Sequence, residues 1–84
     1  MKRVKIKLGT AVRVTWLDSY STVGRVWLER REAELLGTPA IHAIGFLLAD
    51  KPSHITLASH MGDEQVSGVM VIPRGCIVHM TKLR

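Results

Sequence analysis

The sequence predicts a mainly β fold with one short helix, arranged as a small, strongly bent antiparallel β-barrel. Short apolar stretches alternate with polar residues at the period of two that is typical of half-buried strands. Turn-forming residues separate these stretches at short intervals, and a single segment changes to the helical period. Because 84 residues suffice for one compact core, we expect one domain over residues 1–84.

The N-terminal part is predicted to contain two strands and then the helix. Apolar and basic side chains alternate over residues 4–8, which indicates a strand and not the continuous apolar segment of a signal peptide. Residues 12–17 repeat the alternation, and a polar loop follows. Within residues 26–36, three leucines fall at i, i+7 and i+8, so a helix is expected that packs against the rest of the protein. Gly37 suits its C-terminal cap.

The remaining chain is predicted to be β throughout. Gly45 lies inside the first of these strands and is expected to mark a bulge or a sharp bend. Turns are expected at residues 50–53 and 62–64. The strands are predicted over residues 41–49, 54–60, 66–72 and 77–83.

A corner is expected between the last two strands, at Pro73, Arg74 and Gly75. Proline lacks an N–H, so Pro73 should stand where a strand leaves its partner. Gly75 can take a positive φ at little cost. The chain should therefore bend sharply there, with Arg74 pointing away from the core.

These segments resemble Sm-like proteins. The string VIPRGCI resembles the Arg-Gly corner that precedes the last strand of that family, and in GFLLADKPSHITLA the residues Gly45, Asp50 and His54 resemble its bend glycine and Asp-x-x-x-Asn signature. The likeness covers roughly residues 12–83. His54 replaces the base-reading asparagine, Pro73 alters the corner, and the helix does not stand at the N-terminus.

The resemblance implies a five-stranded Sm/SH3-like barrel whose last two strands pair edge to edge between subunits, giving a homo-oligomeric ring. It also implies binding of RNA. The strings AIGFLLAD, ITLA and VIPRGCI are similar, in addition, to short proteins carried by bacterial viruses. That second likeness implies a phage-encoded protein that sequesters a small signalling nucleotide of host immunity.

The net charge and the single cysteine indicate the kind of ligand and the cellular location to expect. The formal net charge of +5 favours an anionic ligand such as a nucleotide or RNA. No apolar run approaches the roughly 20 residues that span a bilayer, so no membrane association is expected. A single cysteine, Cys76, cannot form an internal disulfide, which favours a reducing, cytoplasmic location.

Ligand-binding residues are predicted at and near the corner. A guanidinium on a rigid corner can stack on a base and bind a phosphate, which makes Arg74 the leading candidate. Its alternative role is a salt bridge to Asp63 or Asp50 that holds the corner. The predicted ligand-binding set is Arg74, Gly75, His54, Asp50 and Arg25. Trp27, which follows Arg25 closely, is expected to fix the helix to the sheet.

No catalytic, metal or cofactor site is predicted. The glutamates of the helical segment alternate with arginines as on a solvated face. The four histidines do not have the spacing of a zinc site. Cys76 is not accompanied by an oxyanion motif, as a catalytic nucleophile would be. The sequence thus leaves three functions open: a non-catalytic oligomeric nucleotide-binding protein, an Sm-like RNA or single-stranded DNA chaperone, and a structural or protein-binding ring.

Overall fold

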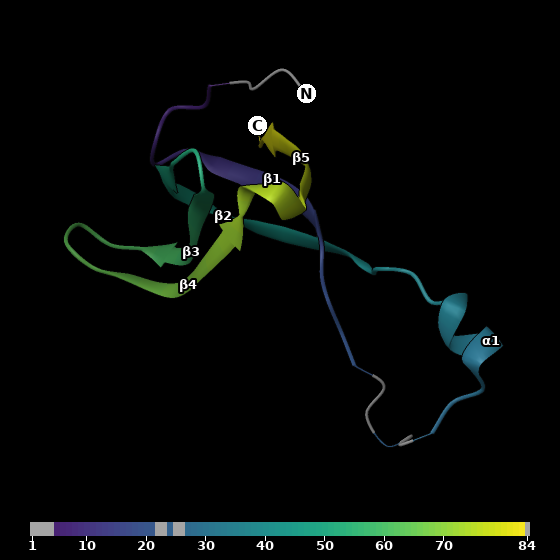
Figure 1. The fold of residues 1–84 in the computed structure, drawn as a ribbon. Helices are drawn as coiled ribbons and strands as arrows, with labels where there is room; N and C mark the ends of the chain where they lie inside the picture. The colour runs from purple at the N-terminus through teal and green to yellow at the C-terminus, as the bar shows by residue number, and fades with distance from the viewer. Residues whose placement is uncertain (1–4, 22–23, 25–26, 84) are drawn as a thin grey trace.

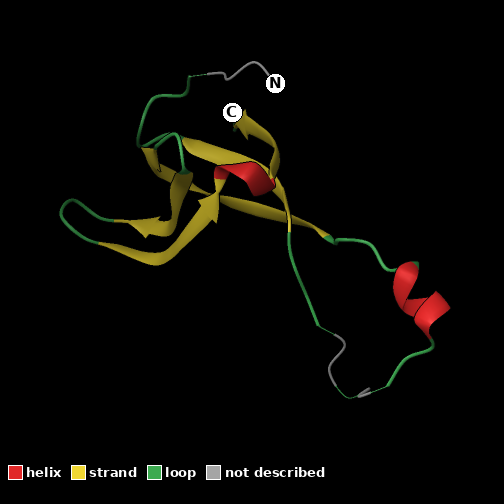
Figure 2. Cartoon of the chain, viewed as in Figure 1, coloured by secondary structure: helices red, strands yellow, loops and turns green. Residues whose placement is uncertain are grey.

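A single antiparallel sheet forms the body of the protein (Figure 1). The computed structural model describes residues 5–21, 24 and 27–83. Within these ranges the elements are β1 (Ala11–Leu17), α1 (Arg30–Glu34), β2 (Ala40–Asp50), β3 (His54–Met61), β4 (Val66–Pro73), a 3-10 turn (Arg74–Cys76) and β5 (Ile77–Lys82). Figure 2 shows the helix apart from the strands. The prediction of a mainly β fold with one short helix is confirmed.

The strand order is β4-β3-β2-β1-β5. β5 does not continue the meander but pairs antiparallel with β1, so β4 and β5 form opposite edges of one open sheet. The register shifts between Leu47 and Ala49 in the β2–β3 pair and between Thr15 and Trp16 in the β1–β5 pair, and such irregularities bend strands. Closure into an Sm-like barrel is not seen in this chain and stays a prediction.

The hydrophobic core is small and lies on one face of the sheet. Alternating residues of β1, β2 and β3 supply most of it, as their period of two requires. The largest fully enclosed side chains are Val12, Val14, Leu47, Ile55 and Ile72, with Ile6 and Leu57 nearly so. So few buried side chains leave the free energy of unfolding of a lone subunit small.

The strand predicted over residues 4–8 is wrong for the part that the structure describes. Residues 5–8 form no ladder with another strand. They are held instead by the following turn, where the Gly9 amide donates to the Leu47 carbonyl at 2.7 Å and the Leu47 amide donates to the Thr10 carbonyl at 2.9 Å. Ile6 is nonetheless 8% exposed and belongs to the core. The alternation therefore identified Ile6 as buried, but Leu8, which it puts on the same face, is 55% exposed, since residues 5–8 have no partner strand.

The helix predicted over residues 26–36 is also wrong in extent and in packing. α1 covers only Arg30–Glu34, contains no buried residue and lies away from the sheet (Figure 1). Trp27 is 89% exposed and Leu35 is 81% exposed, so neither fixes the helix to the sheet. An exposed Arg30–Glu34 ion pair at 3.3 Å accompanies it. A helix this short gains nothing from burial here, and propensity alone does not extend it.

The described residues of the connection from β1 to β2, residues 18–21, 24 and 27–39, therefore project from the sheet (Figure 1). Loops of this length are uncommon inside compact domains. The Cα radius of gyration is 16.0 Å, against about 12 Å for a compact chain of this length. We call these described residues the arm below.

Glycine is required at two places in the sheet. A Cβ on Gly45 would stand 2.9 Å from the carbonyl oxygen of Ala58, so β2 and β3 approach each other there more closely than a side chain allows. Gly68 in β4 has φ +64, and a Cβ on it would lie 2.6 Å from Ser59 Oγ. Gly75 does not take a positive φ, because it lies in the 3-10 turn.

The edge strand β4 is exposed along most of its length. Only Ile72 of this strand is buried, whereas Val69 is 53% and Val71 58% exposed. An apolar edge of this kind is a ready template for pairing with another chain. No helix among the described residues is long and apolar enough to cross a membrane.

Candidate functional site

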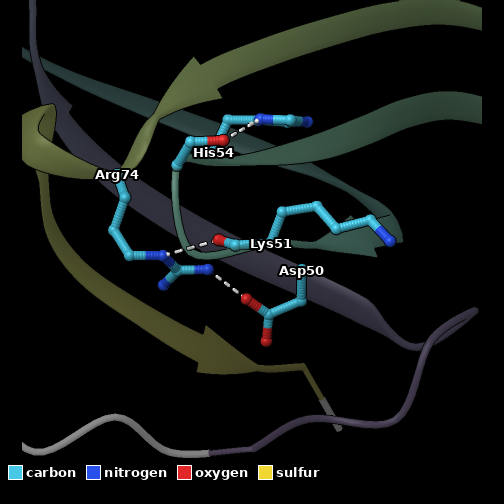
Figure 3. Close-up of polar contacts among 5 residues, drawn as sticks. Asp50, Lys51, His54 and Arg74 are labelled. Atoms are coloured by element: carbon cyan, nitrogen blue, oxygen red, sulfur yellow. Dashed lines mark hydrogen bonds and ion pairs between the residues drawn. The ribbon is translucent and has the colours of Figure 1, made fainter.

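Arg74 ties the corner after β4 to the turn between β2 and β3 (Figure 3). Its Nη2 donates to Asp50 Oδ1 in an ion pair, and its Nε donates to the Lys51 carbonyl at 3.0 Å. The side chains of Arg74 and Asp50 are 27% and 9% exposed. The guanidinium is therefore clamped against the turn and does not simply point away from the core.

The backbone explains why the arginine stands there. Pro73 is the last residue of β4 and faces His54 in the final pair of the β3–β4 ladder, as expected where a strand leaves its partner. The next residue, Arg74, then donates its own amide to the Ser53 carbonyl at 3.0 Å. The turn itself is closed by the Lys51 amide, which donates to the His54 carbonyl at 2.9 Å. The corner and the turn form one hydrogen-bonded unit.

Two further predicted site residues, His54 and Gly75, belong to the same corner. His54 is half-buried on this unit, where its Nδ1 shares a hydrogen bond of 2.8 Å with Ser53 Oγ. Gly75 is exposed, and a Cβ on it would meet no atom within 4 Å, so its own chain does not require glycine at that position. Arg25 lies outside the described residues. The structure thus brings Arg74, Gly75, Asp50 and His54 to one corner.

The two roles predicted for Arg74 are contact with a ligand and a salt bridge that holds the corner. The salt bridge to Asp50 is present, and Asp63, the other possible partner, does not pair with it. Two of the three guanidinium nitrogens, Nε and Nη2, are engaged in these contacts. Because Asp50 offsets the charge of Arg74, the corner offers a rigid donor more than a net cation.

The remaining titratable residues are dispersed. His42 Nδ1 lies 3.0 Å from Thr15 Oγ1 across the β1–β2 pair, on an exposed surface. Cys76 is a half-buried free cysteine in the 3-10 turn. Over residues 5–21, 24 and 27–83, no three histidine, cysteine, aspartate or glutamate side chains are grouped as a metal site would need.

Sequence reasoning missed a group of lysines beside this corner. Lys5 and Lys7 line an open groove of about 740 Å³ together with Lys51 and the end of β2. The pattern of residues 4–8 carried the signal: with Ile6 buried, the lysines on either side must face solvent. Which surface they share with Lys51 depends on the tertiary fold.

Comparison of the chain with protein-family models, with curated proteins and with solved structures finds no match.

Proposed function

We propose that this protein is a non-catalytic, homo-oligomeric binding protein for a nucleotide, which it sequesters without changing it chemically. The observation that carries the proposal is the clamped guanidinium of Arg74. Two contacts hold it in one orientation at the corner, where 27% of the Arg74 side chain is exposed. A donor fixed in advance loses little entropy when it binds an acceptor on the edge of a base.

The free edges of the sheet support self-association. β4 and β5 end opposite sides of the sheet, so the β4 edge of one copy can pair with the β5 edge of the next. Such head-to-tail contacts close into a ring when the rotation between copies allows it. Burial of the exposed apolar residues of β4, such as Val69 and Val71, would favour the assembly. In a ring, the Arg74 corner recurs once per subunit.

The environment of the carboxylates supports a binding role over catalysis. No polar or charged residue in the described ranges is buried. Glu34 of α1 is exposed on the arm, where it pairs with Arg30. General acid catalysis at neutral pH depends on a carboxyl group that its surroundings hold protonated, which usually requires burial.

RNA or single-stranded DNA is the second candidate ligand, and the exposed aromatic residues of the arm favour it. Trp27 is 89% and Tyr20 52% exposed. Aromatic rings at the surface can stack on bases of any identity. This candidate keeps the Sm-like analogy, whereas the first draws on the likeness to short proteins of bacterial viruses.

Native mass spectrometry of protein purified from the cells that express it tests the proposal, because one spectrum reports subunit number and any retained small molecule. We expect an oligomer that carries, or takes up from a panel, a cyclic or linear nucleotide. The purified protein should also be titrated with a short single-stranded RNA at several salt concentrations. Affinity for RNA that falls steeply with salt, with no nucleotide bound, would favour the second candidate. A monomer that binds neither ligand would refute both.

A further inference from the structure

Asp50 already neutralises the charge of Arg74, so the phosphate groups of a nucleotide would need other cations to bind them. A phosphate is bound most strongly where cations are not already offset by carboxylates. The basic residues that the described chain places near the corner are Lys51, in the turn, and the two lysines of the N-terminal segment. All three line the open groove along the end of β2.

The groove has the size and the lining of a nucleotide site. Its volume is about 740 Å³, within the range of small-molecule sites in proteins. Apolar side chains from two segments, Ile6 and Leu48, form walls on which a base or a sugar can rest. Lys5, Lys7 and Lys51 supply ammonium groups from two sides.

The lysines of the N-terminal segment are held in place by the residue between them. Ile6 is buried in the core, so the backbone on either side of it is anchored. The turn that follows is fixed by the Gly9 amide on the Leu47 carbonyl at 2.7 Å. Lys5 and Lys7 also line a second groove of about 380 Å³ on the β5 side, which adds Lys82. Lys5 and Lys7 therefore form a basic ridge between the two grooves, which we call the ridge.

Asp50 lies in the wall of the larger groove, and this gives Arg74 a role there. A carboxylate in the wall repels a phosphate, and the ion pair with Arg74 offsets that charge. The side chain of Lys51 extends away from the guanidinium and is not used in this pairing (Figure 3). Arg74 then acts on the anion through Asp50, as a positioning residue.

We infer that the phosphate groups of the nucleotide bind in the groove lined by Lys5, Lys7 and Lys51, with Arg74 suppressing the negative charge of Asp50 in its wall. This inference rests on the proposed function for the nucleoside part of the ligand. The phosphate site itself can be tested with pyrophosphate, which needs no base recognition.

The first experiment compares two double variants of equal charge change. Lys5→Gln with Lys7→Gln removes the ridge, whereas Arg13→Gln with Arg31→Gln removes two exposed cations outside the lining of either groove. Titrations of ADP and of pyrophosphate are followed by calorimetry and by amide NMR shifts. We expect the ridge variant to bind both probes at least about tenfold more weakly, since two charge-assisted contacts are lost. The control variant should stay within about threefold of the unmodified protein.

The second experiment separates the positioning role of Arg74 from direct contact. Arg74→Gln should weaken pyrophosphate binding, and adding Asp50→Asn to that variant should restore it, because the repelling carboxylate is then gone. Because Asp50→Asn also relieves the destabilising effect of an unpaired, nearly buried carboxylate, the titrations are made at a temperature at which circular dichroism shows every variant to be folded. Amide shifts caused by pyrophosphate should centre on residues 5–7 and 48–51.

Distinct results would overturn the inference and the proposed function. Equal loss of binding in both double variants, or shifts centred away from the groove, would show that the lysine groove is not the phosphate site even if ADP binds. Binding of pyrophosphate in the groove without any affinity for nucleotides would support the phosphate site and refute the proposed ligand. Absence of binding by either probe would refute both.

Discussion

Arg74 and Asp50 form an ion pair that joins the corner after β4 to the last residue of β2. The two residues are far apart in the sequence but adjacent in the fold, and a second bond from Arg74 to the Lys51 carbonyl, at 3.0 Å, completes the clamp. The clamp adds side-chain contacts to the β3–β4 ladder, which pairs the end of β4 with β3 up to His54 and Pro73.

Removal of the clamp should destabilise the protein. We expect Arg74→Ala to lower the free energy of unfolding by about 2 kcal/mol, because a charge-assisted pair and a second hydrogen bond are lost. Urea unfolding followed by circular dichroism measures this. In a double-mutant cycle with Asp50→Ala, the two effects should be less than additive. Fully additive effects would mean that the pair does not form in solution, and Arg31→Ala on the arm serves as the control with little effect.

Substitution by alanine should destabilise the protein at Gly68 and leave its stability almost unchanged at Gly75. Gly68→Ala introduces a side chain at φ +64 and within 2.6 Å of Ser59 Oγ, so a loss of more than about 1 kcal/mol is expected. Gly75→Ala places its methyl group in open space without a positive φ, so the change should stay within about 0.5 kcal/mol. Thermal unfolding of both variants provides the measurement.

A third variant locates the cause of the loss at Gly68. Ser59→Gly combined with Gly68→Ala removes the atoms that the new methyl group would meet and leaves only the backbone strain. Partial recovery relative to Gly68→Ala is expected. If Gly75→Ala proved as damaging as Gly68→Ala, a neighbouring copy or a ligand would have to approach the corner at Gly75.

The two tryptophans should differ in their access to solvent. Trp27 is 89% exposed on the arm, whereas Trp16 packs against the core and its Nε1 is buried without a hydrogen-bond partner in the described part of the chain. With Trp16→Phe, the remaining Trp27 fluorescence should be quenched by acrylamide almost as readily as that of free tryptophan. With Trp27→Phe, quenching should be several-fold weaker and stability should change by less than about 0.5 kcal/mol. Strong protection of Trp27 would mean that the arm is covered in solution.

The proposed assembly depends on the β4 edge, and a lysine placed there should oppose it. Val69→Lys puts a charge on the edge strand, which discourages pairing with another copy. Sedimentation velocity should show a smaller species with an unchanged circular dichroism spectrum. Ile44→Lys, at a residue 66% exposed on the central strand β2, is the matched control and should leave the size unaltered. An identical effect of both substitutions would argue against assembly through this edge.

Local patterns in the sequence predicted most of the strands, because alternation and turn chemistry are properties of neighbouring residues. β2, β3, β4 and β5 lie within a residue or two of their predicted bounds, and Pro73 ends β4 as its missing N–H requires. The buried position of Ile6 followed from the same alternation. Of the site, the sequence indicated the corner residues Arg74, Asp50 and His54.

Only the tertiary structure decided which segments become neighbours. Helical periodicity at residues 26–36 could not reveal that no surface is available to cover the leucines, so α1 is short and exposed. Strand alternation in residues 4–8 could not reveal that β5, and not the N-terminal segment, pairs with the free side of β1. Likewise, the choice of Asp50 over Asp63 as partner of Arg74, and the meeting of Lys5 and Lys7 with Lys51, arise from contacts between distant segments. The strand and helix periods can be read from neighbouring residues, whereas the pairing of distant segments depends on the free energy of the whole fold.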